Sequence, residues 1–351
     1  MSVTLRPPAG TRALRTGPYA VLVRPRSALI VLALLAALAG AAVLALCAGD
    51  AYVPPGRVLD ALLTGGGPDR VVVGELRLPR VVLGALVGAA LGCAGALIQA
   101  VARNPLAGPD VLGVTHGSSV LVVGLMTYGI TASPGQLPWA AVAGGLAAGA
   151  LVYVLAWRGG LAAHRFVLVG IALSSGLSAV TSLFLSHGEG TTAQTAKVWM
   201  TGSLNGADLA QARWLGAVLV VALPFLVGAA RAMRRLALGD EQAQALGARP
   251  GRDRLLLALL GVVLAACAAG AAGPVDFVAL VAPQIAVRLT RSPELPLACS
   301  ALTGAVITVV ADTAARTALA PTELPVGVVT ALVGAPYLLW LLVRARRTRS
   351  H

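Results

Sequence analysis

Long apolar runs cover most of the chain and alternate with short polar segments. Six runs are free of charge and each is long enough to cross a membrane as a helix: 27–49, 81–102, 166–186, 214–230, 255–273 and 324–343. Run 295–316 predicts a further span despite Asp312, and the shorter run 277–290 predicts a partial or strongly packed span.

Segment 111–157 contains no Asp, Glu, Lys or Arg and is too long for one membrane helix. The sequence SPGQLP at 133–138 interrupts it with two prolines and a glycine, which favours two helices joined by a tight turn. The whole pattern therefore predicts an all-α polytopic membrane protein with ten transmembrane helices.

Composition supports a membrane protein, because 57% of residues are apolar, only 12% are charged and the mean hydropathy is +0.83. A soluble chain of 351 residues needs more charge to cover its surface. The first apolar run is long enough to span, which predicts an uncleaved helix and no cleavable signal peptide. The four cysteines, Cys47, Cys93, Cys267 and Cys299, lie in apolar runs outside any CxxC motif and are predicted to be buried.

Charge sets the orientation. The net charge is +13, and the arginines gather in the tail 1–26, in segment 231–254 and in the tail 344–351. Membrane proteins keep such segments in the cytoplasm, so both termini are predicted there and nucleic acid is not expected as a partner. Segments 50–80 and 187–213 then lie outside, whereas 103–110, 158–165, 231–254 and 291–294 lie inside. The expected location is the cytoplasmic (inner) membrane, with residues 27–343 forming one multi-pass domain.

Small residues at four-residue spacing predict where helices pack closely. Gly84, Gly88 and Gly92 form one such row, and Gly145 and Gly149 form another. Glycine at this spacing lets two helix backbones approach each other in lipid.

Three polar interruptions stand at the edges of spans: LRLPR at 76–80, RNPLAGPDVLG at 103–113 and ELPVG at 323–327. In the second, Asp110 is placed to cap a helix beginning at Val111. Arg77, Arg80 and Arg316 fall at outer ends of spans, where arginines either anchor helices or pair with a partner's carboxylates. Segment 231–254 predicts two short helices, the second running from Asp240 to Leu246, for docking a cytosolic partner or for lying on lipid.

Polar side chains within the spans are few, namely Gln99, His116, Gln284 and Asp312. Such a Gln or His more often bonds a neighbouring helix than a ligand. Asp312 is either a proton relay or the partner of Arg316 in an ion pair between residues i and i+4. The sequence contains no catalytic motif and no phosphate-binding loop, so no catalytic residue, cofactor or metal site is predicted and ATP hydrolysis must come from another chain.

Six ordered stretches together resemble the FecCD-type, BtuC-like permease family of ATP-binding-cassette importers for iron-siderophore complexes, heme and vitamin B12. They are LRLPR at 76–80, the segment 84–113, LALGDEQAQALG at 236–247, FVALVAPQ at 277–284, LTGAVITVVADTAAR at 302–316 and the segment 323–342. The resemblance extends over about residues 27–343 and implies a ten-helix, BtuC-like permease bundle.

The resemblance also implies partners and roles. Such a permease pairs with a second permease subunit, more often a related chain than a copy, and sits on a cytosolic ABC ATPase dimer. It implies that Arg77, Arg80 and Arg316 receive an extracytoplasmic substrate-binding protein, and that Gln99, Asn104 and Pro105 lie near the pathway. The contact with the ATPase falls on Gly239, Asp240, Glu241, Ala245, Leu246 and Gly247.

Some positions depart from the family pattern. Pro283-Gln284 replaces the usual Pro-His, GPVDFVAL places Asp276 and Ala279 in a glycine-rich stretch, and the loop before the fifth helix carries Ala163 and His164. Gate residues are therefore not carried over. Segment KVWMTGSLNG at 197–206 is more similar to ferric-siderophore members than to the vitamin B12 member.

The expected cargo is accordingly a ferric siderophore, taken up by ATP-driven alternating access, with vitamin B12 or heme as the alternative. A proton-coupled secondary transporter using Asp312 and an intramembrane enzyme of lipid metabolism are the other classes considered. The second of these would need a polar catalytic cluster in the membrane, and the sequence shows none.

Overall fold

A computed structural model describes residues 12–16, 19–23, 25–49, 51–64, 68–130, 134–157, 163–292, 295–319 and 322–349. Two strands, β1 (Arg12–Thr16) and β2 (Tyr19–Val23), form an antiparallel hairpin ahead of the first helix. This hairpin lies in the segment that the sequence predicts as an N-terminal tail, and every element after it is helical.

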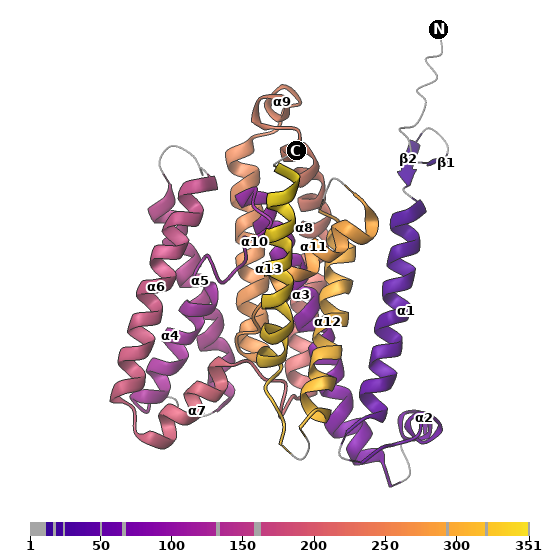
Figure 1. The fold of residues 1–351 in the computed structure, drawn as a ribbon, viewed down its shortest axis with the longest axis vertical. Helices are drawn as coiled ribbons and strands as arrows, with labels where there is room; N and C mark the ends of the chain where they lie inside the picture. Colours follow the sequence, from indigo (N-terminus) through magenta and orange to yellow (C-terminus); the bar gives the residue numbers. More distant parts are fainter. Residues whose placement is uncertain are drawn as a thin grey trace.

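The helices follow one another in chain order (Figure 1). The first six elements are α1 (Pro25–Cys47), α2 (Pro55–Leu63), η1 (Val71–Arg77), α3 (Leu78–Ala102), α4 (Val114–Thr127) and η2 (Pro134–Gln136). Next come α5 (Leu137–Ala156), α6 (Ala163–His187), α7 (Gly190–Met200), α8 (Leu209–Ala237) and α9 (Asp240–Ala245). The last four are α10 (Pro250–Ala272), α11 (Val278–Thr290), α12 (Leu297–Thr317) and α13 (Val326–Arg349).

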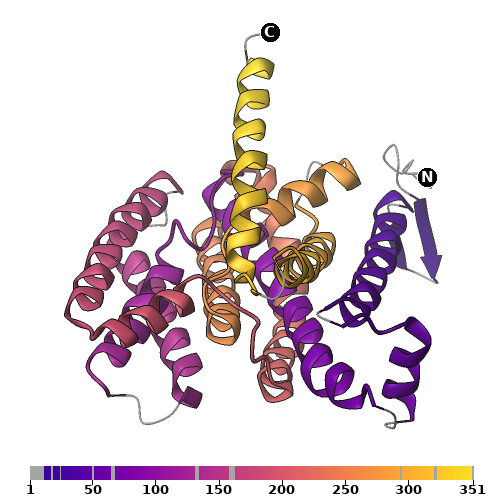
Figure 2. The same cartoon turned by 60° about the horizontal axis from the view of Figure 1, so that its bottom comes forward.

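Helices α3 and α10 form the centre of the bundle, and most of their residues are buried. Both views place α1 and α2 along one edge and the group α4 to α7 along the opposite edge (Figures 1 and 2). The apolar helices α1, α6 and α8 leave most of their surface uncovered within the single chain. In a membrane protein such faces meet lipid or another subunit.

Glycines permit close contact between α3 and α12. A Cβ atom at Gly88 would overlap the carbonyl oxygen of Gly304, and one at Gly92 would overlap that of Ser300. The second predicted row behaves similarly, since a Cβ at Gly149 would meet the side chain of Val262 on α10 at 2.5 Å. Both rows are therefore confirmed as sites of close helix approach.

Hydropathy located the membrane helices well. Among the described residues, seven helices are long and apolar enough to cross a membrane, and three shorter apolar helices cover 114–127, 278–290 and 326–340. Each predicted span coincides with one of these helices. Ten crossings remain a prediction, because α4 and α11 do not reach the length of a full span. All four cysteines are buried, as predicted.

Two local predictions were wrong. Segment 231–254 does not begin with a separate short helix, because α8 continues unbroken to Ala237. LRLPR, predicted at the edge of a span, lies inside the continuous helical stretch formed by η1 and α3. Helix α4 begins at Val114 after Gly113 (φ +73°), with no side-chain cap, so Asp110 does not cap a helix at Val111.

The two ends of the bundle differ in what they carry. The hairpin β1–β2, the short helix α9 and the C-terminal end of α13 lie at one end, and α2 and α7 lie at the other (Figure 1). The arginine-rich segments thus gather at the α9 end, as an orientation with both termini on one side requires.

Candidate functional site

Three arginines meet where α3 begins and α12 ends, at the end of the bundle that carries α2. Arg77 ends η1, Arg80 lies in the first turn of α3, and Arg316 lies in the last turn of α12. Their exposed fractions are only 6%, 7% and 6%. The structure therefore brings the three predicted docking residues together, but it buries all of them within the chain.

Arg77 and Arg316 bind the C-terminal end of α1. The Arg77 guanidinium donates to the carbonyl oxygens of Leu46 (2.7 Å), Cys47 (3.1 Å) and Ala51 (2.7 Å). Arg316 donates to the carbonyl of Ala45 at 3.0 Å. The last carbonyls of a helix lack partners within it and carry partial negative charge, so two guanidinium groups stabilise this end of α1.

Arg80 connects α3 to α12 and to the segment before α13. Its Nε lies 3.0 Å from each carboxylate oxygen of Asp312, and its Nη1 lies 2.9 Å from Oε2 of Glu323. Asp312 also pairs with Arg316 at 3.3 Å, which confirms the ion pair predicted between residues four apart. A carboxylate held between two arginines is suited to an anchor rather than to a proton relay.

Sequence reasoning missed most of this cluster's partners. The carbonyl acceptors on α1 have no signature in the sequence, because any residue supplies a carbonyl. Glu323 did carry a signal, since it opens ELPVG, one of the three polar interruptions, yet nothing in the sequence paired it with Arg80. Side chains of Asp312 and Glu323 are 4% and 36% exposed, so Glu323 is the more accessible carboxylate on Arg80.

The opposite end of the bundle carries the predicted coupling segment. Gly239 (φ +98°) precedes α9, Leu246 follows it and Gly247 (φ +79°) turns the chain away. Glu241, Ala245 and Gly247 are not buried, and Leu246 is 65% exposed. Helix α9 thus presents an apolar side chain and a carboxylate at the end of the molecule, which is a surface suited to a soluble partner.

Asp240 turns the other way and contacts two helices of the bundle. Its Oδ1 accepts from Nη2 of Arg103 at 2.6 Å and from Nη2 of Arg254 at 2.7 Å. Arg103 follows α3 directly in a left-handed conformation (φ 48°), and Arg254 lies in the first turns of α10. A separate ion pair, Arg235 to Asp253 at 3.2 Å, joins α8 to α10 nearby.

The predicted pathway residues lie at the end of α3 but do not share a surface. Gln99 is 3% exposed, donates to the Leu280 carbonyl at 3.1 Å and accepts from Gln284 at 2.7 Å. These bonds join α3 to α11, as expected of glutamines between membrane helices. Asn104 accepts from the Leu106 amide at 3.0 Å and so stabilises the turn, whereas Pro105 is exposed.

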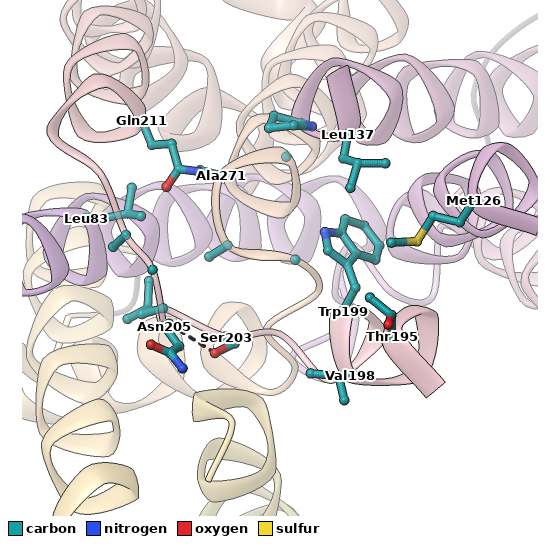
Figure 3. Close-up of a pocket in the computed structure, with 17 residues that line it drawn as sticks. Leu83, Met126, Leu137, Thr195, Val198, Trp199, Ser203, Asn205, Gln211 and Ala271 are labelled. Atoms are coloured by element: carbon teal, nitrogen blue, oxygen red, sulfur yellow. Dashed lines mark hydrogen bonds between the residues drawn. The ribbon is translucent and has the colours of Figure 1, made fainter. Parts of the chain in front are cut away.

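A pocket of about 530 Å³ lies at the α7 end of the molecule (Figure 3). Met126, Leu137 and Trp199 gather on one side of it, and Ser203, Asn205 and Gln211 add polar groups on the other. Six of the ten residues of segment 197–206, singled out in the sequence, therefore line a cavity. Helix α7 contributes Thr195, Val198 and Trp199 to the lining of this pocket, and Ala196 is its one fully buried residue.

Comparison with known proteins identifies the family. The model of the FecCD transport family matches residues 33–344. The achromobactin transport system permease protein of Dickeya dadantii is 41% identical over 301 residues, covering 85% of this chain and 86% of that protein. The ferric enterobactin transport system permease protein of Escherichia coli is 40% identical over 294 residues, covering 82% and 88%.

A cobalamin import system permease protein of Halobacterium salinarum is 41% identical over 284 residues, covering 80% of this chain and 75% of that protein. One solved structure, a metal-chelate type ABC transporter in an inward-facing conformation, has a TM-score of 0.79 and 26% identity. The match covers 90% of this chain and 99% of the chain in that structure. The helical bundle, its order of motifs and these matches agree, and the chain belongs to the FecCD transport family, as a non-catalytic membrane permease component of an ABC importer.

Proposed function

We propose that this permease imports a ferric siderophore across the cytoplasmic membrane. The observation that carries the substrate class is that relatives matching over four-fifths of the chain include a ferric enterobactin permease. Segment 197–206, which is similar to siderophore members, lines the pocket at the outer end and adds support. The cobalamin relative, which is 41% identical, keeps vitamin B12 as the second candidate.

The proposed mechanism is alternating access driven by a cytosolic ATPase dimer. The exposed face of α9, with Glu241, Ala245 and Leu246, serves as the ATPase contact. Closure of the ATPase on ATP moves α9, and the helices around the pathway reorient so that the outer mouth closes as the inner one opens. Asn104 and Pro105 stand where α3 ends on the α9 side, so they lie beside the inner mouth, with Gln99 one turn deeper.

A second permease subunit completes the pathway in this proposal. The apolar helices α1, α6 and α8 leave large surfaces uncovered within the single chain, and lipid covers only part of such a surface in a paired transporter. A related but different chain is the expected partner. Tagged chain purified from its own cells would then carry a second permease in equal amount, whereas a homodimer would yield one permease sequence alone.

A substrate-binding protein docks at the outer end, over Arg77, Arg80 and Arg316. Because all three are buried, reversing their charge would damage the fold as well as docking. A substitution of Glu323 tests docking more directly. Its side chain is partly exposed and pairs with the Arg80 guanidinium, the group that a docking carboxylate would bind. Glu323→Gln should therefore strengthen binding-protein affinity about threefold, a modest change typical of one exposed ion pair. If the affinity for the binding protein were unchanged, the three arginines would serve only to hold the helices together.

Uptake of radioactive iron tests the proposed cargo. Cells with the permease intact or deleted would receive a panel of ferric siderophores, with labelled cobalamin in parallel. Deletion should abolish uptake of at least one ferric siderophore and leave cobalamin uptake unchanged. Loss of cobalamin uptake with normal iron uptake would make vitamin B12 the cargo. The double variant Arg77→Glu/Arg80→Glu should behave as the deletion does.

A further inference from the structure

Asp240 differs from its neighbours at α9 in the direction of its side chain. Glu241 and Leu246 face away from the bundle, whereas Asp240 contacts the bundle through Arg103 and Arg254. Oδ1 of Asp240 accepts a hydrogen bond from Nη2 of Arg103 at 2.6 Å and another from Nη2 of Arg254 at 2.7 Å. Hydrogen bonds between charged groups are the strong ones, and this pair joins three separate segments at one atom.

The two arginines connect Asp240 to the central helices α3 and α10. Arg103 is the residue on which α3 ends, and Arg254 starts α10 with only 10% of its side chain exposed. Helices α3 and α10 are also the most buried long helices in the described part of the chain. Helix α9 follows directly from α8, whose outer surface is mostly uncovered. Helix α10 begins at Pro250, soon after α9, so a displacement of α9 also reaches α10 along the backbone, and the Asp240 contact adds the connection to α3.

We infer that Asp240 is a positioning residue that transmits the movement of α9 to α3 and α10. When α9 is displaced, the shared carboxylate pulls the end of α3 and the start of α10 together, so that both central helices move as one. Arg103 precedes Asn104 and Pro105, so the same displacement moves the turn beside the proposed inner mouth. This inference rests on the proposed function only in taking α9 as the ATPase contact.

The first experiment measures coupling in the complete transporter. The complex purified with its ATPase is placed in proteoliposomes, and iron imported per ATP hydrolysed is compared for the unaltered chain and Asp240→Asn. The substitution keeps the size of the side chain but removes its charge. Import per ATP should fall about tenfold, the range of a coupling free energy between two sites, with ATP hydrolysis and ATPase co-purification retained.

A matched control isolates the contact. Asp253→Asn removes the neighbouring ion pair with Arg235, which joins α8 to α10 without touching α9. This variant should keep import per ATP within about twofold of the unaltered value. If Asp240→Asn retains full coupling, or if it loses the ATPase as a docking residue would, the inference is wrong.

A second readout does not depend on the cargo. Pro105→Cys places an exposed thiol beside Arg103, in a chain whose native cysteines are all buried. ATP should change the rate at which a maleimide labels this thiol, and Asp240→Asn should abolish that change while Asp253→Asn keeps it. Retention of the change in Asp240→Asn would overturn the inference. If no ferric siderophore were imported, the proposed cargo would be wrong, but the labelling result would still test the role of Asp240.

Discussion

At the scale of single residues, buried arginines at the α2 end of the molecule hold the bundle together. Arg77 and Arg316 bind five carbonyl groups between them at or just after the end of α1, counting a longer 3.5 Å contact from Arg316 to Ala48. Gly49 permits this arrangement, because a Cβ there would lie 2.5 Å from Nη2 of Arg77. The anchor therefore depends on a small residue as well as on charge.

Removing the Arg77 side chain should loosen α1. Arg77→Ala leaves three carbonyls without their charged donor, and lost bonds of this type cost about 3 kcal/mol of unfolding free energy in total. Thermal unfolding of the detergent-solubilised chain measures this. Arg57→Ala is the control, because the side chain of Arg57 is 55% exposed and its ion pair with Asp69 should contribute below about 1 kcal/mol. Equal stability of the two variants would contradict the anchoring role.

At this cluster, the sequence predicted which arginines are structurally important but not which groups they contact. Arg77, Arg80 and Arg316 stood out because charge is costly near lipid, and the structure does bring them together. Their burial was not predictable, since the acceptors on α1 lie about thirty positions away from Arg77 and are backbone atoms. In contrast, the pair Asp312–Arg316 was predicted, because residues four apart on a helix are always neighbours.

At the scale of helices, the contact of α3 with α12 should be sensitive to a single substitution of a glycine. Gly88→Ala places a methyl group against the Gly304 carbonyl, so the helices must separate, at a cost of about 1–3 kcal/mol. Gly228→Ala is the matched control, since Gly228 lies within α8 and has nothing near its missing Cβ. That variant should gain about 1 kcal/mol from helix propensity.

Unfolding midpoints of the two glycine variants decide the question, because they should move in opposite directions from the unaltered protein. A rise of both midpoints would show that helix propensity, rather than backbone contact, governs these positions. Sequence spacing alone identified Gly84, Gly88 and Gly92 as a packing row. It did not identify the partner helix, because Gly304 lies more than two hundred residues further along the chain.

At the scale of the whole molecule, hydropathy predicted the helices because lipid leaves no alternative to internal hydrogen bonding in each apolar run. It failed at boundaries set by tertiary contacts. Helix α8 starts at Leu209 because Asp208 accepts from the Ala210 amide at 2.9 Å, and it runs on past the predicted end of the span to Ala237. Polarity alone marked 231–237 as a separate element, although the helix there is continuous.

Orientation gives the last prediction, and it tests the proposed function as a whole. The α9 end gathers the arginines of segment 231–254, so it should face the cytoplasm, with α7 outside. Single cysteines answer this because the native cysteines are buried. Thr191→Cys on α7 should react with a membrane-impermeant thiol reagent in intact cells. Ala245→Cys on α9 should react only after the cells are permeabilised. The opposite pattern would place α9 out of reach of any cytosolic ATPase, and ATP-driven import through α9 would then be excluded.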